Sequence, residues 1–193
     1  MTSPKPHDEL SKLLRQHALE RGEFELSSGG TSSVYVDVRQ VSLSGRGATH
    51  IGDAFWQLIQ QIEPDAEAVG GMTLGADPLV TATTVTAFEK GRDFDGILVR
   101  KASKEHGTGE RVEAPSVLEP GSVVVAVDDT VTTGGSTIDA VEQMREAGFE
   151  IRHALCVVDR EAGARENLAE AGVTLHSLYT LSELTEDEPT DPK

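Results

Sequence analysis

The sequence is poor in cysteine, lysine and membrane-length apolar runs, and each shortage excludes a class of protein. The 193 residues contain one cysteine, Cys156, so no disulfide can form within the chain. Cys156 stands in the apolar run 154–158, which favours a buried, small hydrophobic side chain over a catalytic thiol. No apolar stretch approaches the length needed to cross a membrane, and residues 1–10 are polar. These absences predict a cytoplasmic protein without a secretory signal.

Positive charge is also scarce. The chain has 17 Lys and Arg against 33 Asp and Glu, a formal net charge of −16. Such a surface repels nucleic-acid phosphates and anionic membranes, so we expect neither nucleic acid nor a membrane as a partner. Lysine is rare, and an acidic, lysine-poor surface is typical of adaptation to high salt, although an acidic mesophilic protein has the same composition.

Hydrophobic periodicity predicts one α/β domain over residues 1–184, followed by a disordered acidic tail over 185–193. Residues 7–40 are expected to form a small hood, with two short strands around a Gly/Ser loop. From residue 66 onward, continuous apolar strands alternate with helices, which indicates a parallel central sheet flanked by helices. The expected helices are 7–21, 47–62, 77–90, one that ends at 147, and 161–171. The expected strands are 23–26, 34–38, 66–70, 95–99, 122–127, 151–158 and 173–180.

The most informative segment is 123–137, in which a buried strand ends at Asp128 and Asp129 and a Thr/Gly loop opens a helix. Free N–H groups and the positive dipole end at a helix N-terminus suit a phosphate. Carboxylates beside a phosphate make sense if the ligand also presents sugar hydroxyls or a hard cation such as Mg²⁺. A capped helix after a strand also uses Asp and Thr, but the whole run favours a phosphorylated ribose.

Three further segments follow expected strands. Residues 100–110 cluster cations in an otherwise acidic chain and contain two glycines, which suggests a mobile loop that binds a polyanion. The glycine-rich segment 69–79 contains Thr73 and allows close approach to an anion, although a plain strand-to-helix turn has the same pattern. In 157–168, Asp159 and Arg160 follow a strand and could equally start an ordinary helix.

Segment 123–137 resembles the phosphoribosyl pyrophosphate (PRPP) binding motif of the type I phosphoribosyltransferases. The Arg-Lys-x-x-Lys-x-His-Gly spacing of 100–107 resembles the catalytic loop of the orotate phosphoribosyltransferases, and the likeness extends over about 8–181. The resemblance implies the type I phosphoribosyltransferase fold and Mg²⁺ as cofactor. It implies transfer of the 5-phosphoribosyl group from PRPP to orotate, giving orotidine 5′-monophosphate and pyrophosphate in UMP biosynthesis. It also implies a homodimer in which loop 100–110 is shared across the interface.

The resemblance also assigns residues to roles. The catalytic residues, which stabilise charge on the departing pyrophosphate, are Lys104, His106, Arg100 and Lys101. The PRPP-binding residues are Thr73, Asp128, Asp129, Thr130, Val131, Thr132, Thr133, Gly134, Gly135 and Ser136. Orotate is bound by Thr132, Arg160 and Tyr35, and Mg²⁺ is held mainly by the substrate with Asp128 and Asp129 nearby.

The hood departs from the family pattern. Many members have a lysine in the Ser/Gly loop and a proline before the aromatic residue, whereas here 27–33 lacks lysine, Ser33 replaces proline, and aromatic contact depends on Tyr35.

Two other functions share the phosphate loop. A purine phosphoribosyltransferase is disfavoured by Arg160 and by the spacing of loop 100–110. A PRPP-sensing regulator that binds nucleic acid is disfavoured by the net charge of −16 and by the short segment before the hood.

Overall fold

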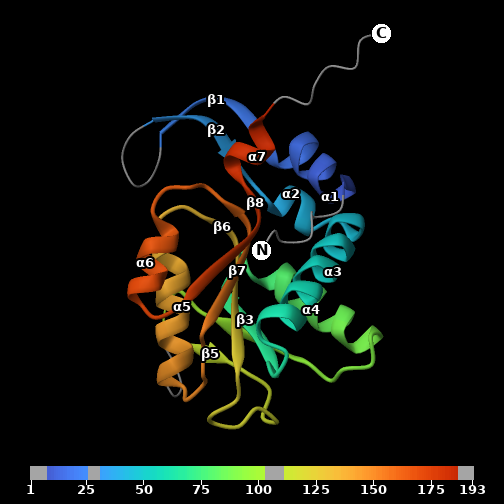
Figure 1. Cartoon of the computed structure of the whole chain (residues 1–193), viewed down its shortest axis with the longest axis vertical. Helices are drawn as coiled ribbons and strands as arrows, with labels where there is room; N and C mark the ends of the chain where they lie inside the picture. Colours follow the sequence, from blue (N-terminus) through green and yellow to red (C-terminus); the bar gives the residue numbers. More distant parts are fainter. Residues whose placement is uncertain (1–7, 26–30, 103–110, 187–193) are drawn as a thin grey trace.

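The computed structural model describes residues 8–25, 31–102 and 111–186, and its main element is a six-stranded sheet with helices on both faces (Figure 1). The sheet has the order β5-β4-β3-β6-β7-β8. Its strands are β3 (Ala68–Met72), β4 (Asp95–Val99), β5 (Val112–Glu113), β6 (Val124–Val131), β7 (His153–Asp159) and β8 (Thr174–Thr180). The helices are α1 (Asp8–Leu13), α2 (Arg39–Ser42), α3 (Gly45–Ile62), α4 (Asp77–Glu89), α5 (Gly135–Glu146), α6 (Ala164–Glu170) and α7 (Leu181–Thr185).

Two hydrophobic layers enclose the sheet, because successive side chains of a strand point to opposite faces. Val125 and Val127 of β6 pack on the face covered by α3 and α4, together with Phe55. Val124 and Ala126 pack in the second layer with residues of α5 and α6. These two helices cover the other face of the sheet (Figure 1). Full burial of an aliphatic side chain contributes about 1.5–3 kcal/mol, so the central strands anchor both layers. Cys156 is buried in the second layer, as a small hydrophobe would be.

The order of the parallel strands reverses between β3 and β6. From β3 the chain passes through α4 to β4 on one side, and β6 then returns to the other side of β3. At such a switch point the loops that leave the two strands diverge and open a crevice beyond their carboxyl ends. The segments that follow β3 and β6 are those that carry Thr73 and the phosphate loop.

The hood is a two-stranded antiparallel sheet of β1 (Leu19–Glu25) and β2 (Thr31–Val36), which lies with α1 and α7 beyond one end of the main sheet (Figure 1). Helix α1 continues as one π-helical segment, Leu14–Ala18. Among the helices of the described residues, none is both long and apolar enough to cross a membrane.

The expected α/β class and parallel sheet are confirmed, with several local differences. The spacing of apolar residues predicts a helix to residue 21, but the helix ends at Ala18 because Leu19 pairs with Val36 in the hood. The pair β4–β5 is antiparallel, and β5 was missed because two residues carry no periodicity.

Two further differences concern element ends. Strand β6 was expected to end at residue 127 and instead runs through the acidic pair to Val131. The tail was expected to begin at Thr185, but this residue ends α7, which a capping box at Thr180 and the buried Leu184 hold in place. Residues 187–193 lie outside the described part of the chain.

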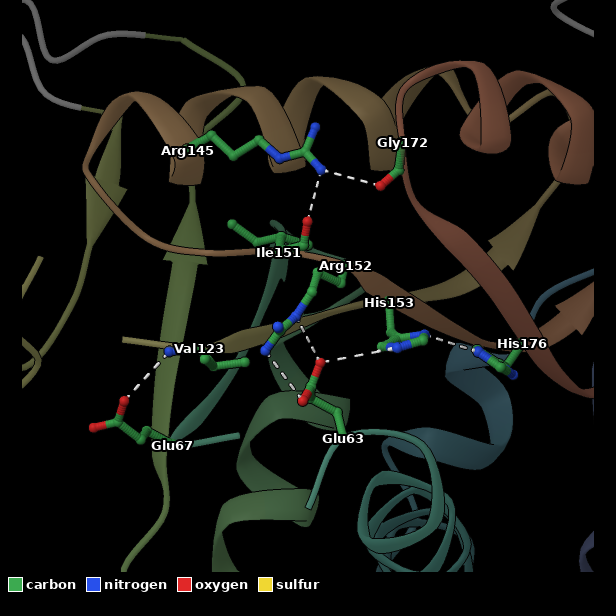
Figure 2. Close-up of polar contacts among 9 residues, drawn as sticks. All are labelled: Glu63, Glu67, Val123, Arg145, Ile151, Arg152, His153, Gly172 and His176. Carbon is green, nitrogen blue, oxygen red and sulfur yellow. Dashed lines mark hydrogen bonds and ion pairs between the residues drawn. The ribbon is translucent and has the colours of Figure 1, made fainter. Parts of the chain in front are cut away.

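A polar cluster lies near the amino ends of β7 and β8, at the opposite end of the sheet from the switch point (Figure 2). Arg152 donates from Nε and Nη2 to the two carboxylate oxygens of Glu63, at 3.0 and 3.3 Å. His153 lies with Nε2 3.8 Å from Glu63 and with Nδ1 3.1 Å from Nε2 of His176. Burial, reinforced by the nearby His153 and Arg165, lowers the pKa of His176. Only one proton fits between the two facing ring nitrogens, so a neutral His176 suits this cluster.

The lowered pKa of His176 predicts how this cluster responds to acid. Below about pH 6.5 the unfolded chain binds a proton at this imidazole that the folded chain resists, so acid favours unfolding. We expect the melting temperature of H176Q to fall less than that of the wild type between pH 7 and 5. Thermal unfolding across this range measures the difference, with the exposed His17 replaced in H17Q as control. Parallel pH profiles for H176Q and the wild type would contradict this reading.

Candidate active site

A cavity of about 430 Å³ opens at the switch point between β3 and β6. Thr73 and Gly75 line it from the loop after β3, and Asp129 and Ser136 line it from β6 and the phosphate loop. Gly75 is needed for this approach, because a Cβ at residue 75 would stand 2.9 Å from Oδ1 of Asp129. The structure therefore brings Thr73 and the acidic pair together, as expected from the sequence.

Both residues of the acidic pair line this cavity, Asp128 buried and Asp129 half-buried. Asp128 accepts a 2.7 Å hydrogen bond from the Thr137 hydroxyl and a 2.9 Å bond from the Asp129 backbone N–H. Oδ1 of Asp129 accepts from the Thr130 N–H at 2.7 Å. Burial, together with the neighbouring Asp129 charge, raises the pKa of Asp128 to about 7, and burial also raises the pKa of Asp129. These carboxylates are therefore incompletely compensated and would be stabilised by hydroxyl donors or a cation.

The phosphate loop lines a second cavity, of about 270 Å³, which shares Asp128, Thr130 and Ser136 with the first. All the loop residues expected to bind PRPP, from Thr130 to Ser136, line this cavity. Gly134 caps α5 with φ +85°, a conformation that L side chains rarely adopt. The first N–H groups of α5 have no acceptor within the helix, so an anion in this cavity meets both N–H donors and the positive end of the helix dipole.

The hood and Arg160 meet at a third cavity. It measures about 740 Å³ and is lined by Ser33 and Val34 of β2 and by Arg160. The Arg160 guanidinium donates to the Val34 carbonyl at 3.4 Å, and Arg160 also lines the phosphate-loop cavity. Tyr35 lines the 430 Å³ cavity and packs against Phe24, with the ring centroids 5.5 Å apart and the rings tilted by 35°. Of the three residues expected to bind orotate, Thr132 and Arg160 thus line the phosphate-loop cavity together, whereas Tyr35 lines the adjoining 430 Å³ cavity.

Of the four residues expected to be catalytic, the structure places one, Lys101, at the site. Lys101 lines the 430 Å³ cavity. Arg100 instead pairs its Nε with Glu113 at 2.8 Å and is absent from the lining of this cavity. Lys104 and His106 lie outside the described residues.

Sequence analysis missed Asp37 and Arg39, which follow the hood strand and line the 430 Å³ cavity. Oδ1 of Asp37 accepts from Nε of Arg39 at 2.8 Å, and this bond is the main reason that the pKa of Asp37 is lowered. Arg39 also lies close enough to Asp129 for their charges to interact. An arginine after the hood strand of an acidic chain was the available signal, but only the folded chain places it beside the acidic pair.

Asp128 and Asp129 suit Mg²⁺ as ligands, but they are only two residues. Asp128 and Asp129 offer the hard carboxylate oxygens that Mg²⁺ prefers, and their raised pKa values favour a neighbouring positive charge. In the ranges 8–25, 31–102 and 111–186, however, no group of three or more His, Cys, Asp or Glu could hold a metal ion. These residues fit an ion that takes most of its ligands from a bound substrate.

This fold and phosphate site define a phosphoribosyltransferase. The family described as "Phosphoribosyl transferase domain" matches residues 47–177. Orotate phosphoribosyltransferases of Thermosynechococcus vestitus and Aquifex aeolicus are 43% and 39% identical to this chain, over 91% and 92% of it and 91% and 96% of their own lengths. The Mycobacterium tuberculosis orotate phosphoribosyltransferase in complex with PRPP is similar in structure, with a TM-score of 0.73, 31% identity, and coverage of 95% of this chain and 93% of that one. The chain therefore belongs to the orotate phosphoribosyltransferase family.

The raised pKa of Asp128 predicts a stability effect with a definite sign. Between about pH 4 and 7 the folded chain holds a proton at Asp128 that the unfolded chain has lost, so the charged form destabilises the fold above pH 7. We expect D128N, without ligand, to melt above the wild type at pH 8, with a gap that narrows toward pH 5. Calorimetric melting curves measure the gap, and E142Q, at an exposed carboxylate of α5, is the control. A gap that widens as the pH falls would contradict the assignment.

Proposed function

We propose that this chain transfers the 5-phosphoribosyl group from PRPP to orotate, giving orotidine 5′-monophosphate and pyrophosphate in pyrimidine biosynthesis. The observation that carries the proposal is the pair of adjoining cavities that share Asp128, Thr130 and Ser136. One offers a helix N-terminus to a phosphate, and the other offers buried carboxylates to sugar hydroxyls. A ribose with phosphate at one end and pyrophosphate at the other spans both.

Each part of PRPP then has a partner in the chain. Loop residues 130–136 bind the 5-phosphate, and Asp128 and Asp129 accept hydrogen bonds from the ribose hydroxyls. Thr73, Lys101 and Arg39 surround the pyrophosphate, with Lys104, His106 and Arg100 as further cations. Electrostatic stabilisation of charge on a leaving group contributes about 3–4 kcal/mol per well-placed donor, so the cations favour bond breaking.

Orotate lies between the hood and the phosphate loop. Arg160 faces both cavities there, and a guanidinium fork suits the orotate carboxylate and carbonyls. Thr132 and Tyr35 complete the base site. The bond from the anomeric carbon to pyrophosphate breaks with its electron pair leaving on oxygen. A ring nitrogen of orotate forms the new bond and gives up its N–H proton to the departing pyrophosphate.

Mg²⁺ belongs to the same proposal. When bound with PRPP it neutralises pyrophosphate charge, and Asp128 and Asp129 are the residues of this chain that suit it. Hydrogen bonds from Thr137 and from backbone N–H groups fix these two carboxylates, so they also hold the ribose hydroxyls in one orientation. A cytoplasmic location is part of the proposal as well.

The purine and regulatory alternatives have weaker support. The relatives at 43% and 39% identity carry the orotate name, and Arg160 lies where the proposed base pocket meets the phosphate loop.

Purified protein should consume orotate only when both PRPP and Mg²⁺ are present. The loss of orotate absorbance measures this directly, in low and in high salt. R160A should raise the KM for orotate about tenfold or more, because the carboxylate loses its guanidinium, while the KM for PRPP changes little. Activity with adenine or guanine in place of orotate, or no activity at either salt concentration, would reject the proposal.

The proposed homodimer has a candidate surface, which we call the α4 face: the residues lining an 820 Å³ cavity along α2, α3 and α4. Three apolar side chains line it and are unusually exposed, Leu43 at 74%, Leu74 at 71% and Val85 at 53%. Exposed apolar clusters of this kind mark protein contacts. Arg39, Asp37 and Leu74 line both this cavity and the 430 Å³ cavity, so a second copy seated here would reach the site.

The wild type should therefore have about twice the chain mass of 20.6 kDa in solution. V85E places a charge on the α4 face and should produce monomers, whereas V117E, at an exposed valine outside this face, should leave the dimer intact. Light scattering after gel filtration distinguishes the two masses. A V85E protein that stays dimeric would exclude this surface.

Sharing of loop 100–110 between subunits predicts complementation. K104A and the double variant D128N/D129N should each be nearly inactive alone, but mixed dimers carry one intact site if the loop acts across the interface. Activity should recover to roughly a quarter of wild type after subunit exchange, because half the dimers are mixed and each has one of two sites. No recovery would mean that the loop acts within its own subunit.

A further inference from the structure

Arg111 forms a compact network beside the site that the proposed reaction does not yet use. Its Nη1 and Nη2 donate to the two carboxylate oxygens of Asp139 at 2.9 and 2.6 Å. Its Nε donates to the backbone carbonyl of Arg100 at 2.7 Å, and its own carbonyl accepts from the Arg100 N–H at 2.8 Å. The Arg111 side chain is only 18% exposed. All three kinds of guanidinium nitrogen are therefore engaged within the protein.

The network joins two parts of the site. The Arg100 carbonyl belongs to the peptide unit that leads into Lys101, and Lys101 lines the 430 Å³ cavity. Asp139 lies on α5 three residues after Ser136, which lines the same cavity. Residues three apart share one side of a helix, so the bridge connects the phosphate-binding end of α5 to the backbone next to Lys101.

This geometry differs from that of an anion-binding arginine. Arg111 is absent from the linings of the 430 and 270 Å³ cavities, and its charge is matched by a bidentate carboxylate. A fork held at all three nitrogen positions fixes the orientation of the peptide that it binds.

We propose that Arg111 and Asp139 are positioning residues that orient the Arg100–Lys101 peptide and so hold Lys101 at the pyrophosphate side of the site. The inference rests on the proposed function, in which Lys101 stabilises the departing pyrophosphate. Helix α5 then has two roles. Its N-terminus binds the 5-phosphate, and its Asp139, through Arg111, positions Lys101 beside the pyrophosphate.

A double-mutant cycle tests this coupling. K101A should lower kcat about 100-fold, the usual effect of removing one charge-stabilising donor. R111Q and D139N should each lower kcat about tenfold, with little change in the KM for PRPP, because the 5-phosphate and ribose contacts remain. In the K101A background, R111Q should change kcat by less than about twofold, since the side chain that it positions is gone. R111K should resemble R111Q, because one ammonium cannot join three acceptors.

The chain offers a control in Arg152, which forms a bidentate pair with Glu63 near the amino end of β7, at the opposite end of the sheet from the site (Figure 2). R152Q breaks an arginine–carboxylate pair away from the site and should leave kcat unchanged, while the melting temperature of each variant measures its loss of stability. The comparison separates positioning from general destabilisation.

Each other outcome overturns the inference. An equal loss of kcat in R152Q would attribute the effect to stability. An equal tenfold loss from R111Q with and without Lys101 would mean that Arg111 acts elsewhere. If K101A has the kcat of the wild type, Lys101 has no catalytic role and Arg111 cannot act by positioning it. The activity of the wild type would still support the proposed reaction. If R111Q does not fold, D139N in the same cycle decides the matter. Failure of the proposed function itself is visible separately, as an inactive wild type.

Discussion

The burial of two adjacent carboxylates at the end of β6 is the constraint on which the rest of the site depends. Asp128 is buried and Asp129 half-buried at the switch point, and within the described residues their hydrogen-bond donors are two backbone N–H groups and the Thr137 hydroxyl. Burying a charged group without full compensation is unfavourable by several kcal/mol, and the raised pKa of Asp128 is the visible consequence. The arrangement makes physical sense when hydroxyl groups and a cation arrive with the ligand.

The neighbouring elements are arranged around this charge. The N-terminus of α5 provides the opposite polarity a few residues away and separates a phosphate site from a hydroxyl site. Arg39 and Lys101 bring positive charge to the open side of the carboxylates from two distant segments, the end of the hood and the end of β4. Arg111 ties the second of these segments to α5. In the proposed complex, the ribose therefore lies between the carboxylates of β6 and the cations Arg39 and Lys101, which come from other segments of the chain.

Local patterns in the sequence were enough to predict β4, the phosphate loop and the α/β class, because each depends on neighbours along the chain. The first helix was predicted to extend to residue 21, but it ends at Ala18 because Leu19 pairs with Val36 in the hood. Arg39 beside Asp129, and Arg111 with Asp139, are contacts across long stretches of chain, and no local signal marks them. The sequence likewise did not reveal that Tyr35 and Arg160 line different cavities, since that separation depends on how the hood sits over the sheet.

The most direct test of the account is whether ligand binding changes the protonation of the buried pair. Titration calorimetry of PRPP with Mg²⁺ at pH 7, in buffers with different heats of ionisation, measures protons exchanged on binding. Because burial raises the pKa of Asp128 to about 7 and hydroxyl donors favour its charged form, the account predicts proton release in the wild type and a smaller release in D128N. Binding with equal proton release in both proteins, or no heat of binding at all, would contradict it.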